Sequence, residues 1–152
     1  MFRDRVILGL RSGVIAAAAI VGVLLGLGRA HDSTFRPLNA VAHVALGSRA
    51  LLFDRLSLEV TLLGLILLVG ALLVWGVLFA FVAASLRGIR LLIAGTLFTV
   101  VVYLVNAGLL PPRFRPGFEL ILSAAELAAV YIALAVALTA ALMLSRALRN
   151  RA

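Results

Sequence analysis

The chain contains no cysteine and no lysine, so all 14 of its basic residues are arginine. Without cysteine it forms no disulfide and offers no thiolate for redox chemistry, a metal ion or an iron–sulfur cluster. The absence of lysine, beside abundant alanine, leucine, glycine and valine, is typical of a GC-rich coding genome. We therefore expect a bacterial source.

Polar side chains are also scarce. Charged residues make up 13% of the 152 residues, hydrophobic residues make up 64%, and the mean hydropathy is +1.21. Too few polar residues are present to cover the surface of a soluble domain. The net charge of +8 comes from arginines that flank apolar runs, where they meet anionic lipid headgroups. We expect one membrane domain over 1–152 that contacts the lipid bilayer and has no nucleic-acid partner.

Four long apolar runs account for most of the chain. Each approaches or exceeds the roughly 20 residues that cross about 30 Å of hydrocarbon as a helix. Backbone amides find no water there, so helices are the expected form. Arg11 inside the first run, and the lack of a small-x-small cleavage site after it, favour a retained helix over a signal peptide. The sequence predicts an all-α integral membrane four-helix bundle, with spans at about 6–28, 59–85, 91–110 and 117–145.

The distribution of arginine indicates the orientation. Four spans place both termini and the turn at 87–90 on one side of the membrane. That side carries eight arginines against six on the other, which by the positive-inside rule predicts cytoplasmic termini in a bacterial cytoplasmic (inner) membrane. The eight are Arg3, Arg5, Arg11, Arg87, Arg90, Arg146, Arg149 and Arg151, and the six are Arg29, Arg36, Arg49, Arg55, Arg113 and Arg115.

The first connection, which we call the cap (33–58), is too long and too patterned for a simple turn. Pro37 suits the first position of a helix and Gly47 suits its end. Asn39 and His43 are spaced i, i+4 on one face. We predict a short extracytoplasmic helix that is interfacial or re-entrant. Because the chain has only two histidines and metal sites need three or four ligands, a structural role is favoured for His43, and no metal or cofactor is expected.

The candidate functional residues lie in the last two spans. Glu126 is the acidic residue deepest inside a predicted span, roughly 13 Å from its start at 1.5 Å per residue. If these spans form an antiparallel hairpin, Asn106 falls near Ser123, and Tyr103 or Thr99 falls near Glu126. The predicted polar cluster comprises Glu126, Tyr103, Asn106, Ser123, Glu119 and Thr99.

Two interpretations of this cluster stay open. An intramembrane carboxyl often marks a proton or ion path. Alternatively, Glu126 is hydrogen-bonded and merely fastens the third span to the fourth. No Ser-His-Asp arrangement, phosphate-binding loop or paired-carboxylate site is recognisable, so we do not expect an enzyme.

Small residues recur every four positions in the first and last spans. Such ridges let helices approach closely, and we expect this to occur within the bundle rather than between protomers. Trp75, midway along the second span, is expected to pack rather than bind. The ridges are Gly9, Gly13 and Ala17, then Gly22 and Gly26, and in the last span Ala125, Ala129, Ala133, Ala137 and Ala141.

Two segments carry a family resemblance. The stretches PLNAVAH at 37–43 and PRFRPGFELILS at 112–123 resemble an uncharacterised family of small four-span bacterial inner-membrane proteins. The resemblance implies the four-span fold and no activity. A histidine pair precedes a tryptophan in the second span of that family. Here Trp75 is present, but Leu68 and Val69 stand at the corresponding positions, so no metal or haem role is carried over.

These observations favour a non-catalytic accessory or assembly subunit of a membrane complex, with a membrane-protein partner or further copies of the chain. The alternative is an oligomeric transporter or channel for a proton, small cation or polar solute that uses Glu126.

Overall fold

The computed structural model describes residues 2–149, in which all regular structure is helical. The π-helical turn η2 (Val105–Leu109) continues the third long helix, and the two together span 21 residues. The all-α class and the four helices of spanning length and apolarity are confirmed. The long helices are α1 (Phe2–Ala30), α4 (Leu58–Ala83), α5 (Ile89–Leu104) and α6 (Ala124–Arg149).

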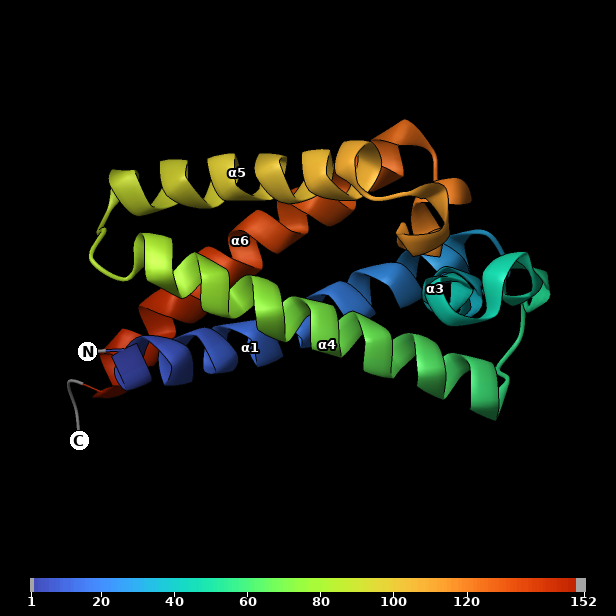
Figure 1. Cartoon of the computed structure of the whole chain (residues 1–152), viewed down its shortest axis with the longest axis horizontal. Coiled ribbons are helices and arrows are strands. Elements are labelled where there is room, and N and C mark those ends of the chain that lie inside the picture. Colours follow the sequence, from blue (N-terminus) through green and yellow to red (C-terminus); the bar gives the residue numbers. More distant parts are fainter. Residues whose placement is uncertain (1, 150–152) are drawn as a thin grey trace.

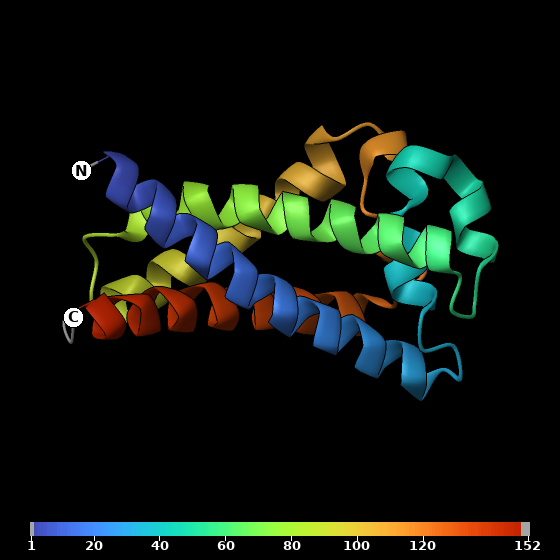
Figure 2. The same ribbon diagram turned by 90° about the horizontal axis from the view of Figure 1, so that it is seen from below.

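The four long helices run alternately up and down. α1 begins and α6 ends at the same end of the bundle as the α4–α5 turn, while the cap and the α5–α6 connection lie at the other end (Figures 1 and 2). α1 packs against both α4 and α6, and α5 packs mainly against α6. α4 and α5 leave their shared turn and diverge towards the cap (Figure 1).

Glycines allow α1 and α4 to cross almost in backbone contact. A Cβ atom on Gly13 would lie 2.7 Å from the Leu72 carbonyl oxygen, and one on Gly76 would lie 2.6 Å from the Gly13 nitrogen. Contacts this close leave no room for a side chain, and close backbone approach is what small residues provide between apolar helices. The expectation that the first ridge of small residues is used within the bundle is confirmed for Gly9 and Gly13.

The other small residues divide between the two faces of their helices. A Cβ on Gly22 or Gly26 would meet nothing within 4 Å, so these two glycines face outward. In α6, Ala137 and Ala141 are buried. The predicted ridges therefore serve the bundle core over only part of their length, because α1 and α6 each cross their neighbours rather than run alongside them.

The cap is made of three short helices, not one. They are α2 (Arg36–Val41), α3 (His43–Leu46) and the 3₁₀ helix η1 (Gly47–Leu52). Gly47 has a φ of 63°, a left-handed conformation that glycine adopts readily, and it ends α3 as its position predicted. α2 is wedged between α4 and the α5–α6 connection, since Cβ atoms on Gly64 and Gly117 would strike its carbonyl oxygens. Its position relative to a bilayer stays a prediction.

The fourth span begins later than predicted. α6 starts at Ala124 rather than near 117, and the preceding residues form the 3₁₀ helices η3 (Pro112–Phe114) and η4 (Gly117–Leu120). Pro116 suits the first turn of a helix, but only the short η4 follows it. Ser123 and Glu126 instead form the capping box that starts α6, as described below.

We expect Gly13→Ala to destabilise the bundle, because the new methyl group would force α1 and α4 apart. Overpacking of this kind costs about 1–3 kcal/mol. Gly22→Ala is the matched control on the same helix, and it should be neutral or stabilising because alanine favours helix more than glycine does. Circular dichroism, recorded while each purified variant is unfolded in detergent, measures the stability of both. Equal unfolding midpoints for the two variants would contradict the close crossing.

Candidate functional site

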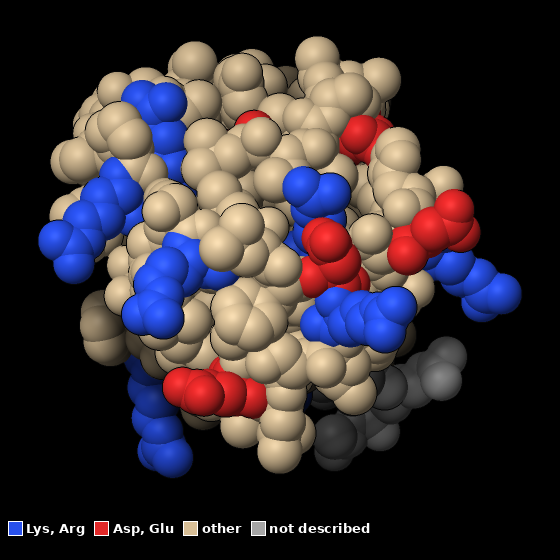
Figure 3. Space-filling view, turned by 90° about the vertical axis from the view of Figure 1, so that its right-hand side faces the viewer, with Lys and Arg blue, Asp and Glu red and all other residues tan. Residues whose placement is uncertain are grey.

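Charged side chains lie at both ends of the bundle, and the side chains of Glu119, Glu126 and His43 lie at the cap end. Figure 3 looks onto this end and shows arginine and acidic side chains scattered over an otherwise uncharged surface. One exposed ion pair, Arg36 Nε to Asp54 Oδ1 at 3.2 Å, lies within the cap. Exposed pairs of this kind contribute little to stability. Two hydrogen-bonded groups at this end are better defined.

The first group surrounds Glu126, which lies in the first turn of α6 and not deep within the span. Its Oε2 accepts hydrogen bonds from the Ser123 backbone nitrogen at 2.8 Å and from the Ser123 hydroxyl at 2.7 Å. The Glu126 nitrogen lies 3.3 Å from the Ser123 hydroxyl oxygen. This reciprocal pattern is a capping box, which satisfies amides that a helix start leaves open. The prediction that Glu126 lies well inside the fourth span is wrong, because α6 begins at Ala124, seven residues later than the proline turn suggested.

His31 completes this first group. Its Nε2 lies 2.5 Å from Glu126 Oε1, which links the end of α1 to the start of α6. The imidazole is well exposed, whereas the carboxyl is only 19% exposed. Sequence reasoning placed His31 in a loop and did not pair it with Glu126, since nothing in local spacing relates residues 95 positions apart.

The second group is a chain of hydrogen bonds that joins the α5–α6 connection, α6 and η2. Tyr131 donates its hydroxyl to Glu119 Oε1 at 2.5 Å, and Asn106 donates its amide to the Tyr131 oxygen at 3.0 Å. Burial raises the pKa of the Glu119 carboxyl, an effect opposed by the Tyr131 hydrogen bond and by the charge of Arg115. Glu119 and Asn106 were both predicted as site residues, but Tyr131, which joins them, was missed.

The remaining residues of the predicted cluster are not joined to Glu126 by any hydrogen bond among the described residues. The Thr99 hydroxyl donates to carbonyl oxygens of its own helix, those of Gly95 and Thr96. The Tyr103 ring packs edge-on against the Tyr131 ring, with centroids 5.2 Å apart. The predicted contacts of Tyr103 or Thr99 with Glu126, and of Asn106 with Ser123, are therefore absent from the hydrogen bonds in this part of the chain.

The two predicted cap residues, Asn39 and His43, differ in whether their side-chain polar atoms have hydrogen-bond partners. Asn39 is fully buried, and it binds the Phe53 and Arg55 carbonyl oxygens at 2.9 Å each and the Thr61 hydroxyl at 2.6 Å. This network fixes the cap to the start of α4. His43 is half-buried beside Gly117, and its Nδ1 atom has no hydrogen-bond partner in the described structure.

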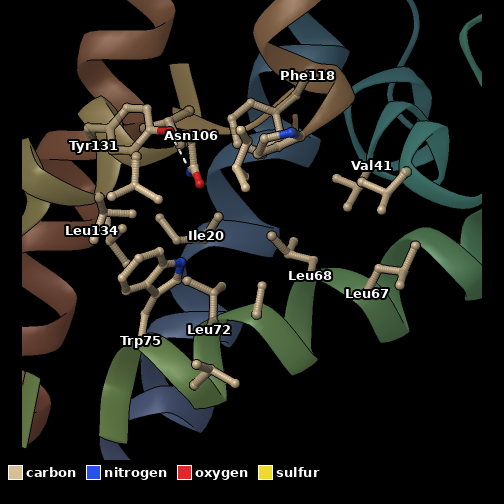
Figure 4. Close-up of a pocket in the computed structure, with 18 of the residues that line it drawn as sticks. Ile20, Val41, Leu67, Leu68, Leu72, Trp75, Asn106, Phe118, Tyr131 and Leu134 are labelled. Carbon is tan, nitrogen blue, oxygen red and sulfur yellow. Dashed lines mark hydrogen bonds between the residues drawn. The ribbon is translucent and has the colours of Figure 1, made fainter. Parts of the chain in front are cut away.

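A cavity of about 410 Å³ lies in the wedge between α4 and α5 (Figure 4). Side chains from α1, α4, α5, α6, the cap and the α5–α6 connection line it, and they are almost all apolar. Asn106 and Tyr131 lie at one end, next to Phe118, and Trp75 lies at the opposite end (Figure 4). This volume is within the range of about 300–1,000 Å³ that small-molecule pockets occupy.

No protein-family model matches this chain, and neither does any curated protein or solved structure in the comparisons. The resemblance of residues 37–43 and 112–123 to a four-span family therefore stays a hypothesis.

We expect Tyr131→Phe to destabilise the folded protein by about 1–3 kcal/mol, because it leaves Asn106 and Glu119 without their shared partner. Tyr103→Phe is the matched control, since no described residue hydrogen-bonds to that hydroxyl, and its effect should stay within about 0.5 kcal/mol. Unfolding in detergent by denaturant titration measures both. Equal losses would show that the Glu119–Tyr131–Asn106 chain contributes nothing.

Proposed function

We propose that this chain is a four-span protein of the bacterial inner membrane, with cytoplasmic termini and an extracytoplasmic cap, that acts as a non-catalytic accessory subunit of a membrane complex. Four apolar helices of spanning length support the membrane assignment. The eight-to-six excess of arginine on the terminal side supports the orientation. The long exposed apolar faces of the helices suit a protein whose contacts are lateral.

The observation that carries the accessory role is a groove of about 480 Å³ on the outer face of α5 and α6. Alanines of α6 form its floor, including Ala124, Ala128 and Ala135. Thr96 lines the groove too, but its hydroxyl donates to the Leu92 carbonyl oxygen of its own helix. The groove therefore offers a shallow surface of small residues, of the type that lets a second transmembrane helix approach closely.

Tyr103 places a polar hydroxyl group in this groove. Its side chain is 41% exposed, it lines the groove, and none of the described residues hydrogen-bonds to its hydroxyl. A hydroxyl without a partner is unfavourable in hydrocarbon. A partner helix that offers an acceptor would remove this cost, so we assign the groove to a transmembrane helix of another protein.

A transporter or channel is the weaker proposal. It was motivated by a carboxyl in mid-span, whereas Glu126 caps the first turn of α6. Among the described residues of the four long helices, charged side chains lie near the helix ends, apart from Arg11 in the third turn of α1. Reconstituted vesicles should show no proton or cation flux in either wild type or Glu126→Gln. Flux that the substitution abolishes would favour transport over the accessory role.

Photocrosslinking in native membranes tests the groove. We expect a photoreactive benzoylphenylalanine at Ile132, which lines the groove and is 64% exposed, to give one discrete adduct whose peptides map to a transmembrane helix. The same residue at Ile66 on α4, which is 58% exposed, is the matched control and should label lipid only. Tyr103→Phe should reduce the Ile132 adduct.

Two results would overturn this proposal. Equal labelling from Ile132 and Ile66 would show that the groove has no preferred partner. An adduct with the mass of two copies of this chain would make the groove a homo-oligomer contact instead.

A further inference from the structure

We infer that the cavity between α4 and α5 is a binding site for a single hydrocarbon chain that carries a hydrogen-bond donor at one end, such as the hydroxyl of a lipid alcohol or of a protonated fatty acid. This inference concerns a different face from the α5/α6 groove and does not depend on it. It rests on the shape of the cavity and on one acceptor that lines it, the side-chain oxygen of Asn106.

The cavity is open to the surface. Its inner wall is formed by buried side chains such as Ile20, Leu68 and Leu134. Val74 and Phe114 also line it, although they are 60% and 52% exposed, so they mark its mouth. Val74 lies in the middle part of α4, a helix long and apolar enough to span a membrane, so in a bilayer this side of the mouth would face lipid chains. A long apolar ligand can therefore enter sideways without crossing water.

Asn106 provides an acceptor at the cap end of the cavity. The side chain is 9% exposed, and its amide nitrogen is used to donate to Tyr131. Because Tyr131 gives its only hydroxyl proton to Glu119, its oxygen can only accept, which fixes the nitrogen of Asn106 towards it. The Asn106 oxygen then points into the cavity, as Figure 4 shows. It accepts no hydrogen bond from the described residues.

This acceptor determines the chemistry of the ligand. The Asn106 oxygen is accessible from an almost wholly apolar pocket and accepts no hydrogen bond from the described residues, so a ligand with a donor would satisfy it. A hydroxyl satisfies it, whereas an ester or a methyl group does not. Asn106 also lies in the π-helical turn η2, and such turns are frequent at functional sites.

Trp75 lies at the end of the cavity opposite Asn106. Its ring lies edge-on to Phe98 at 6.0 Å, and Phe98 precedes Asn106 by eight residues, or about 12 Å along α5. The wall between these levels is apolar. A chain whose hydroxyl binds Asn106 therefore extends inward until its hydrocarbon touches the indole. Trp75 is the one tryptophan of the sequence, so its fluorescence reports this contact directly.

The test uses the full-length protein in phosphatidylcholine vesicles with a bromine-labelled fatty alcohol, because bromine quenches only an indole that it touches. We expect saturable quenching of Trp75 that cetyl alcohol or palmitic acid relieves. Methyl palmitate, which lacks the donor, should compete about 3- to 10-fold less well, as expected for the loss of one hydrogen bond. Comparison of the alcohol with the acid identifies which source of the hydroxyl is preferred.

Three variants test whether the quenching reports binding inside the cavity. Asn106→Leu should reduce the preference for the alcohol over the ester towards one, a ratio that a general loss of stability would not change. Ala71→Phe adds bulk at an exposed position that lines the cavity, and it should lower the quenching. Val82→Phe adds the same bulk to an exposed position of α4 outside the cavity and should leave the quenching unchanged.

Quenching that does not saturate, or that alcohol and ester relieve equally in wild type, would show contact with bulk lipid only and would overturn the inference. Unchanged quenching in Ala71→Phe would also overturn it, provided that circular dichroism shows the variant to be folded.

Discussion

The glycine-mediated crossing of α1 and α4 determines the shape of the rest of the bundle. Gly13 and Gly76 bring the two backbones into contact, so α4 is held by α1 along one side. α5 is held separately by α6, where Gly95 lies against the Thr139 side chain. α4 and α5 are each packed mainly against a different neighbour, and beyond their shared turn the rings of Trp75 and Phe79 on α4 contact Phe98 on α5. The wedge that contains the cavity is a consequence of this arrangement.

The number and type of the long helices were predictable because they depend on hydropathy and length, which are read directly from the sequence. The start of α6 was not, because two signals compete there. Pro116 suits the first position of a helix, while Ser123 and Glu126 have the spacing of a capping box. The capping box satisfies two open amides, whereas the proline only removes one donor. The stronger set of hydrogen bonds decides the boundary, and Glu126 becomes a cap.

Only part of the candidate site could be predicted, again because the start of α6 was not predictable. Asn106 and Glu119 were identified as polar residues in the right region, but their link through Tyr131 depends on where α6 begins. The buried face of α5 and η2 consists of Leu91, Gly95, Thr99, Val102 and Asn106, so Tyr103 lies beside this face and not on it. The pairing of His31 with Glu126 depends on how α1 crosses the bundle, which no local pattern encodes.

The cavity between α4 and α5 is difficult to explain as an empty space. It is open to the surface, and its lining is almost wholly apolar. Water does not fill such a space, because apolar cavities stay dry. Hydrocarbon does fill it at little cost where the mouth opens onto lipid. The wedge therefore suits the apolar chain inferred above, and the oxygen of Asn106 is the group that would distinguish a chain with a hydrogen-bond donor from one without.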